Sequence, residues 1–148
     1  KVMKVKLRID SQVTEDSVSI EARLMTESIQ ELVHFAQHLD KEDKIHVKKE
    51  DNIYLLDAKE IHRVYTENRQ VQVRTAKDSY RAQQALYQLL QVLPEYFLQI
   101  SQSEIINSRQ ISHLKLTPNG LIQIFLKNGD QTYSSRRYLK SIKERLQL

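Results

Sequence analysis

The last fifteen residues of the chain hold the side chains with the most specific chemistry. They read SSRRYLKSIKERLQL, so that two serines precede the adjacent arginines Arg136 and Arg137. A guanidinium group can bind a phosphate, or pair with both O6 and N7 of guanine in the major groove of DNA. Ser134 or Ser135 could cap a following helix, whose first N–H groups attract phosphate. The segment therefore predicts an anion-binding site at the start of a helix.

The rest of this terminal segment predicts a helix that packs on a domain core. Its apolar residues recur at helical spacing and are Leu139, Ile142 and Leu146. This stripe is narrow and lacks Trp and Phe, whereas a membrane-surface helix needs a large apolar face. The other basic residues of the helix, expected to face solvent, are Lys140, Lys143 and Arg145.

The five histidines of the chain raise the question of a metal site. Glu31, His34 and His38 stand at i, i+3 and i+7 of a predicted helix and could share a face. Catalytic zinc needs three protein ligands and an open position, and the sequence has no HExxH motif and no cysteine. We therefore predict a solvated helix face and no metal. The remaining histidines, expected to be half-buried in strands, are His46, His62 and His113.

Catalytic motifs are not found. Ser, His and Asp all occur, but there is no GxSxG elbow, and two glycines in the whole chain leave no room for a glycine-rich oxyanion or phosphate loop. Asp10, Asp16 and Asp40 are not spaced like a carboxylate dyad. We predict that the protein is not an enzyme and has neither cofactor nor small-molecule substrate.

The elements that position these residues are mainly strands from residue 45 onward. Short alternating runs are broken by polar turns such as Asn68-Arg69, and Asn128-Gly129 is a strong hairpin signal. The predicted strands lie at 44–50, 52–57, 60–67, 70–76, 96–101, 104–108, 110–116 and on both sides of Asn128-Gly129. One helix interrupts them, with leucines at helical spacing over 85–93 and its end at Pro94. The pattern predicts a mainly β (α+β) domain at 45–148.

The first 44 residues differ from this pattern. Residues 3–9 and 17–22 alternate with period two and predict two strands. From Thr26 the period becomes helical, with Thr26 or Ser28 as cap and a charged linker at 40–44. We predict a small β-β-α extension at 1–44, which can bury little surface alone and is expected to dimerise or dock on a partner.

Composition and charge limit the classes of function. The chain of 148 residues is 40% hydrophobic and 28% charged, has no cysteine, and contains no apolar run near the ~20 residues of a membrane span. These features, and a start without a signal-peptide core, favour a cytoplasmic protein.

Residues 1–44 hold 7 Lys and Arg against 9 Asp and Glu, and residues 45–148 hold 16 against 10. The basic main domain favours a polyanionic partner. An acidic protein and RNA remain alternatives, although paired stacking aromatics of an RNA-binding sheet are not evident.

The order of motifs resembles that of the LytTR family of bacterial DNA-binding domains. The matching residues are Phe97, Ser103, Ile106, Asn107, Ile111 and the run Ser135-Arg136-Arg137-Tyr138. The resemblance covers about residues 45–147. It implies a short-stranded β-sheet domain with one internal helix and a C-terminal helix, which contacts the major groove of double-stranded DNA through loops.

The resemblance also implies which residues contact DNA. In the family, side chains enter the groove from the loop before the fourth strand, from the segment before Ile-Asn, and from the last strand-to-helix junction. Carried over, the residues expected to contact bases are Arg69, Gln102 and Arg137. Those expected to hold the DNA backbone or support the loops are Asn68, Ser101, Ser103, Asn107, Arg136 and Lys140. For Asn107 a purely structural role, bonding the neighbouring backbone, is the alternative.

The chain departs from the family pattern at three positions. Gln99 and Gln102 stand where the family often has basic residues, and Ser108 replaces a common apolar residue. Gln102 can still pair with adenine, but it cannot supply the charge that releases counterions.

The resemblance finally implies a mode of regulation. Only about 44 residues precede the domain, too few for a receiver domain, so the chain resembles the stand-alone branch of the family. Such regulators bind direct repeats as dimers and are commonly restrained by a small membrane protein. The extension at 1–44 is then the expected site of dimerisation or of that contact.

Overall fold

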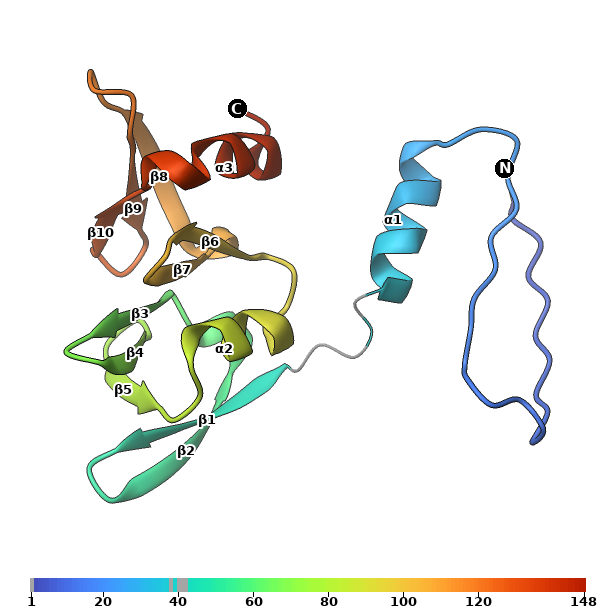
Figure 1. Ribbon diagram of the computed structural model, residues 1–148, viewed down its shortest axis with the longest axis horizontal. Coiled ribbons are helices and arrows are strands. Elements are labelled where there is room, and N and C mark those ends of the chain that lie inside the picture. Colours follow the sequence, from blue (N-terminus) through green and yellow to red (C-terminus); the bar gives the residue numbers. More distant parts are fainter. Residues whose placement is uncertain (1, 38, 40–42) are drawn as a thin grey trace. The chain divides into compact units, whose positions relative to one another are not determined.

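The computed structural model describes residues 2–37, 39 and 43–148 (Figure 1). The chain forms two compact units, Lys1–Leu39 and Asp40–Leu148, which are described separately. His38 and residues 40–42 of the predicted linker lie outside the described residues. No helix in the described ranges is long and apolar enough to cross a membrane.

The N-terminal unit contains one helix, α1 (Glu27–Gln37). The hydroxyl of Thr26 accepts a hydrogen bond of 3.3 Å from the amide of Ile29, so the predicted helix and its cap are confirmed. The prediction of strands at 3–9 and 17–22 is wrong, because these segments are extended but form no ladder. Their apolar side chains have no core to pack against within the unit, and an isolated two-stranded hairpin is marginal in water.

The C-terminal unit is built from ten antiparallel strands in two sheets. The larger sheet has the order β2-β1-β5-β4-β3-β7-β6 and the smaller has the order β10-β9-β8. The larger sheet comprises β1 (Lys44–Lys49), β2 (Asn52–Asp57), β3 (Arg63–Glu67), β4 (Gln70–Arg74), β5 (Ser79–Ala82), β6 (Phe97–Ser101) and β7 (Glu104–Asn107). The smaller comprises β8 (Ile111–Leu116), β9 (Ile122–Leu126) and β10 (Gln131–Tyr133). The predicted mainly β fold is confirmed.

Two α-helices and three short 3-10 turns complete this unit. The helices are α2 (Leu86–Val92) and α3 (Leu139–Leu146), and the turns are Ala58–Glu60, Ser108–Gln110 and Arg136–Tyr138. Strand β5 was not predicted, because it has only four residues and two of them, Ser79 and Arg81, are exposed. The strand predicted at 60–67 begins at Arg63, since Glu60 ends a 3-10 turn and Ile61 and His62 belong to neither element.

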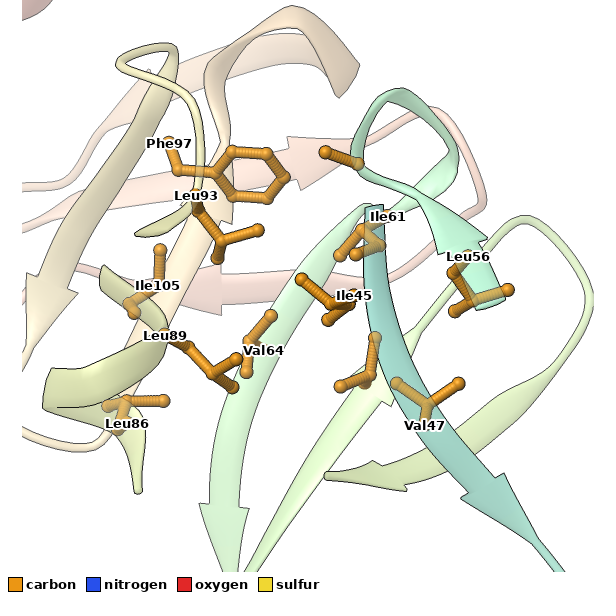
Figure 2. Close-up of a cluster of buried hydrophobic side chains, with 12 residues drawn as sticks. Ile45, Val47, Leu56, Ile61, Val64, Leu86, Leu89, Leu93, Phe97 and Ile105 are labelled. Carbon is orange, nitrogen blue, oxygen red and sulfur yellow. The ribbon is translucent and has the colours of Figure 1, made fainter. Parts of the chain in front are cut away.

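Helix α2 covers one face of the larger sheet. Its residues Leu86 and Leu89 are buried with Val64 of β3 and Ile105 of β7 in the cluster drawn in Figure 2. The helix starts where the side-chain oxygen of Gln88 accepts a 2.8 Å hydrogen bond from the amide of Ala85. Each buried leucine contributes about 1.5–3 kcal/mol of hydrophobic free energy, so this face holds α2 in place.

A second core joins strands β6 and β7 to the smaller sheet and to helix α3. It contains Leu98, Ile100, Ile106, Ile122, Ile124, Leu126 and Ile142. Leu139 and Leu146 pack at its edge, which confirms the predicted docking of the last helix. Neither predicted serine caps the helix with its side chain. The buried hydroxyl of Ser134 accepts a 3.0 Å hydrogen bond from the amide of Ile122. Ser135 stands at the N-cap of the 3-10 turn but makes no side-chain cap hydrogen bond.

Candidate nucleic-acid interface

Two turns of the larger sheet lie at the same end of adjacent strands. Strand β3 runs antiparallel to β7 with Tyr65 opposite Glu104, and the amide of Thr66 donates a 2.9 Å hydrogen bond to the carbonyl of Ser103. The end of β3 therefore lies beside the start of β7. The β3–β4 turn, Asn68-Arg69, projects next to the β6–β7 turn, as Figure 1 shows at the left of this unit.

The junction between β10 and α3 reaches the same end. The amide of Ser135 donates a 2.9 Å hydrogen bond to the carbonyl of Ile100, near the end of β6. Ser135, the residue before Arg136 and Arg137, is thus fixed to the strand that ends just before Gln102. The structure brings together all three segments that sequence comparison with the family selected.

The β3–β4 turn has an unusual backbone. Asn68 and Arg69 have φ angles of 51° and 66°, and these two residues alone separate the paired Glu67 and Gln70. Left-handed residues at both positions fit the twist of a tight hairpin, where Asn and Gly are favoured. Arginine has no such preference and is conformationally strained there. Its side chain is exposed at the end of the turn.

The β6–β7 turn presents Gln102 at its tip. Gln102 is exposed, and the hydroxyl of Ser101 accepts a 3.2 Å hydrogen bond from the amide of Ser103. A bulge between Gln99 and Ser101 bends the strand just before the turn. The two serines therefore fix the backbone around Gln102 and leave its amide group accessible.

The basic residues of the junction are accessible and unneutralised. Arg136 and Arg137 form the exposed 3-10 turn, and Lys140 is exposed in the first turn of α3. None of the three has an ion-pair partner among the described residues of this unit. Their charges can therefore be used on an anionic ligand.

Asn107 has a different environment. Its side chain is fully buried, its Nδ2 donates a 2.9 Å hydrogen bond to the carbonyl of Ile61, and its Oδ1 accepts one of 2.9 Å from the amide of Arg109. With 0% exposure it cannot touch a ligand on the surface. Of the roles considered for this residue, the geometry is that of loop support.

A network of charged side chains, which the sequence did not predict, connects the strands that carry these turns. Arg63 Nε lies 2.8 Å from Glu104 Oε2, an ion pair without the alignment of a hydrogen bond, and Arg63 Nη1 lies 3.8 Å from Asp130 Oδ2. Arg74 donates two hydrogen bonds of 3.1 Å to Asp130. The hydroxyl of Thr132 donates one of 2.8 Å to Glu104 Oε1. The network joins the two sheets, and no spacing in the sequence could have shown it.

The two acids of this network respond differently to burial. Burial raises the pKa of Glu104, and the nearby Arg63 and Thr132 offset only part of that effect. Burial also acts to raise the pKa of Asp130, but the hydrogen bonds from Arg74 and the charges of Arg74 and Arg63 outweigh it and lower that pKa. Asp130 is therefore the firmly ionised member of the network.

The histidines at described positions have different environments, and His38 of the set Glu31, His34 and His38 lies outside the described residues. No group of three metal-ligating side chains occurs within 2–37, 39 and 43–148. His46 and His113 are exposed rather than half-buried, and His113 stacks on Phe125 with ring centroids 4.3 Å apart. His62 is buried, its Nδ1 has no partner among the described residues, and burial lowers its pKa.

Comparisons with known proteins address the domain and the whole chain separately. The model of the LytTr DNA-binding domain family matches residues 51–147. A solved LytTr DNA-binding domain from Bacillus cereus superposes with a TM-score of 0.69 over 72% of this chain and 99% of that one, at 15% identity. That similarity establishes the shared fold.

Full-length relatives occur in Staphylococcus aureus. Proteins named uncharacterized HTH-type transcriptional regulators in strains NCTC 8325 and MRSA252 are 37% and 36% identical over 147 residues. These alignments cover 99% of this chain and 100% of each relative, so they include the N-terminal unit.

The described part of this chain has no helix-turn-helix, despite the names of those relatives. That motif needs two consecutive helices joined by a short turn, whereas five strands separate α1 from α2 and another five separate α2 from α3. By its fold and by the match over residues 51–147, the chain belongs to the LytTr DNA-binding domain family.

Proposed function

We propose that this chain is a bacterial, cytoplasmic transcription regulator that binds specific sites in double-stranded DNA. The observation that carries the proposal is the convergence of three exposed loops, held by the hydrogen bonds Thr66–Ser103 and Ser135–Ile100. Loops at one end of a sheet can enter a major groove, which is about 12 Å wide. A regulator of this kind needs no cofactor and no catalytic group.

Each exposed loop supplies one side chain that can contact a base. Arg69 and Arg137 can each pair bidentately with guanine, and Gln102 can pair with adenine. Arg136 and Lys140 lie beside Arg137 and are assigned to phosphates. Asn68, Ser101 and Ser103 shape the two turns, since their side chains or backbone fix the loops that carry Arg69 and Gln102.

The proposed functional state is a homodimer on direct repeats, formed through the N-terminal unit. Within that unit Ile29 is the only buried apolar residue among those described. Val5, Leu7 and Ile9 are 82–87% exposed, which is far more apolar surface than a soluble unit normally leaves to water. A second copy would cover it. The alternative occupant is the small membrane protein that restrains stand-alone members of the family.

The decisive experiment is selection of bound sites from a pool of random DNA. Two short motifs about one helical turn apart are expected, because each protomer contacts one half-site. Absence of any enriched sequence would contradict the proposal and would favour an acidic protein as the partner of the basic surface.

Arg137→Ala tests the assignment of residues. It should weaken specific binding by about 1–3 kcal/mol and relax the preference at one base position. Lys127→Ala, which removes one charge in the β9–β10 turn, is the matched control and should leave that preference unchanged. An equal loss of affinity for every sequence would assign Arg137 to a phosphate instead.

A further inference from the structure

A groove opens beside the β3–β4 turn, on the side away from the β6–β7 turn. Its volume is about 570 Å³, and its polar lining consists of Thr66, Lys48, Arg69, Arg81, Gln70, Gln83 and Gln84. A smaller groove of about 360 Å³ adjoins it and shares Lys48, Arg81 and the last two glutamines. The two adjoining grooves are together called the basic groove, and Arg69 lines the larger of them.

The basic groove carries positive charge that no acidic side chain at 43–148 neutralises. No acidic side chain lines it among the described residues. The side chains of Lys48, Arg69 and Arg81 have no ion-pair partner among the residues that the structure describes. The neighbouring Lys49, in contrast, lies 2.9 Å from a carboxylate oxygen of Asp78. The groove therefore gathers three cationic side chains that have no acidic partner among the described residues.

The strand register makes this arrangement unfavourable for the free protein. Strands β1 and β5 are paired with Lys48 directly opposite Arg81. Two like charges opposite each other on one face of a sheet repel and destabilise the pairing. An anion bound between them would remove that repulsion, so the pair is suited to a ligand of negative charge.

The groove also lies in register with the loops. In the order β1-β5-β4-β3-β7, four strand-to-strand spacings separate β1 from β7, the strand that begins after Gln102. Neighbouring strands are about 4.8 Å apart, which gives a separation of roughly 19 Å. This is on the order of half a turn of DNA, whose full turn is about 34 Å. A duplex held by the loops would bring its flanking backbone to the groove.

We propose that the basic groove binds the phosphodiester backbone of the DNA that flanks the specifically contacted site. Lys48 and Arg81 each neutralise one phosphate, and Gln83 and Gln84 are placed to donate hydrogen bonds from their amide groups. Arg69 marks the boundary between base contacts and backbone contacts. The inference rests on the proposed function, because it requires DNA to be bound at the loops.

The test compares two double variants of the full-length chain. Lys48→Gln/Arg81→Gln removes the two groove charges. Lys77→Gln/Lys127→Gln removes two charges from turns at the opposite end of the strands, which a 3.0 Å hydrogen bond from Asn128 to the carbonyl of Thr75 holds together. Both variants lose the same net charge, so only the position of the loss differs.

The measurement is the dependence of operator affinity on salt. Each phosphate contact contributes about 0.9 to the slope of log affinity against log salt. The groove variant should therefore have a slope smaller by about 1.8, and its loss of affinity between 50 and 200 mM salt should be roughly tenfold smaller than that of the wild type. The control variant should keep the wild-type slope.

Shortening the DNA provides a second readout. Removing the flanking base pairs should weaken binding by the wild type and leave the groove variant unaffected. The groove variant should unfold at the same or a higher denaturant concentration, because a repulsive pair has been removed. If the wild type selects an operator, but the groove variant and the control variant have the same slope of log affinity against log salt, the groove inference is wrong and the proposed function stands. If the wild type selects no DNA, both are wrong.

Discussion

The amide of Ser135 is hydrogen-bonded to the carbonyl of Ile100 at 2.9 Å, and this bond joins the last strand-to-helix junction to strand β6. Along the chain, most residues of the second hydrophobic core lie between these two residues. Their bond places Arg137 near Gln102, which follows Ile100 by two residues. The third loop is connected in the same way, through the amide of Thr66 and the carbonyl of Ser103. A scaffold of hydrogen-bonded strands therefore determines where the three exposed segments lie.

Asn107→Ala should separate stability from recognition. The substitution removes two buried hydrogen bonds and leaves the carbonyl of Ile61 and the amide of Arg109 without these partners. Each unsatisfied buried group costs about 1–3 kcal/mol, so we expect a loss of roughly 2–5 kcal/mol in urea unfolding. Base preference, measured on the folded fraction, should not change. A changed preference in a fully folded variant would place Asn107 in contact with DNA.

Arg69→Gly should stabilise the domain while it weakens DNA binding. Glycine adopts the positive φ of this position without strain, which is expected to add about 0.5–1 kcal/mol to the free energy of unfolding. Specific affinity should fall, because the guanidinium is lost. Gln147→Gly, at the left-handed residue that ends α3, is the control. It should give a similar gain in stability and leave binding intact. Unchanged DNA affinity in Arg69→Gly would refute the assignment of this arginine.

The Arg63–Glu104 pair should show strong coupling. Arg63→Leu leaves the buried carboxylate of Glu104 without its cation and should cost about 3–5 kcal/mol. Replacing both residues by leucine should cost much less than the sum of the two single changes, because no buried charge then remains unpaired. Urea unfolding of the four proteins measures this coupling. Additive losses would show that the pair contributes no mutual stabilisation.

The buried His62 should make stability depend on pH. Burial lowers its pKa in the folded state, so the unfolded state binds the proton more readily. The stabilisation of the neutral imidazole is present above the unfolded pKa of about 6.5 and is lost as the pH falls below it. Glu104 acts in the opposite sense, since its raised pKa stabilises the protein as protons are added. The comparison between wild type and His62→Leu isolates the histidine. Lowering the pH from 7.5 to 5.5 should reduce the unfolding free energy of the wild type more than that of His62→Leu. If the difference between the two proteins is the same at both pH values, His62 does not cause the pH dependence.

Deletion of residues 1–39 should abolish the dimer and spare the DNA contacts. The deleted unit carries exposed apolar residues such as Leu7, and the remaining unit has its own hydrophobic cores. Sedimentation should give a monomer that binds a single half-site with unchanged base preference. In the full chain, Leu7→Asp should have the same effect on assembly, because it places a charge on the apolar surface. A truncated chain that remains dimeric would show that the interface lies in the DNA-binding unit.

Much of the fold could be predicted because most strands alternate and most turns carry recognisable residues. The Asn128-Gly129 hairpin, the leucine pattern of α2 and the stripe of Ile142 in α3 each contain their own local signal. The segments at 3–9 and 17–22 show the limit of that approach. They have the alternation of strands, but a ladder also needs a surface on which one face is buried, and the described unit does not provide it.

The candidate site was predictable only in part. Family motifs selected the three loops, yet the hydrogen bonds that bring them together are between backbone atoms and leave no trace in residue type. The network around Glu104 and Asp130 joins residues 26 positions apart, and the basic groove depends on the register of β1 against β5. Such contacts are set by tertiary packing, which no local pattern records.

The way in which the loops are held has a consequence for how operator preference can change over evolutionary time. Thr66, Ser103, Ile100 and Ser135 are joined through main-chain atoms, which are the same for every residue type except for the missing N–H of proline. Substitutions at the neighbouring Arg69, Gln102 and Arg137 therefore leave these bonds in place. A duplicated copy of the gene could acquire a new set of target promoters through changes at these three codons, with the scaffold inherited unaltered.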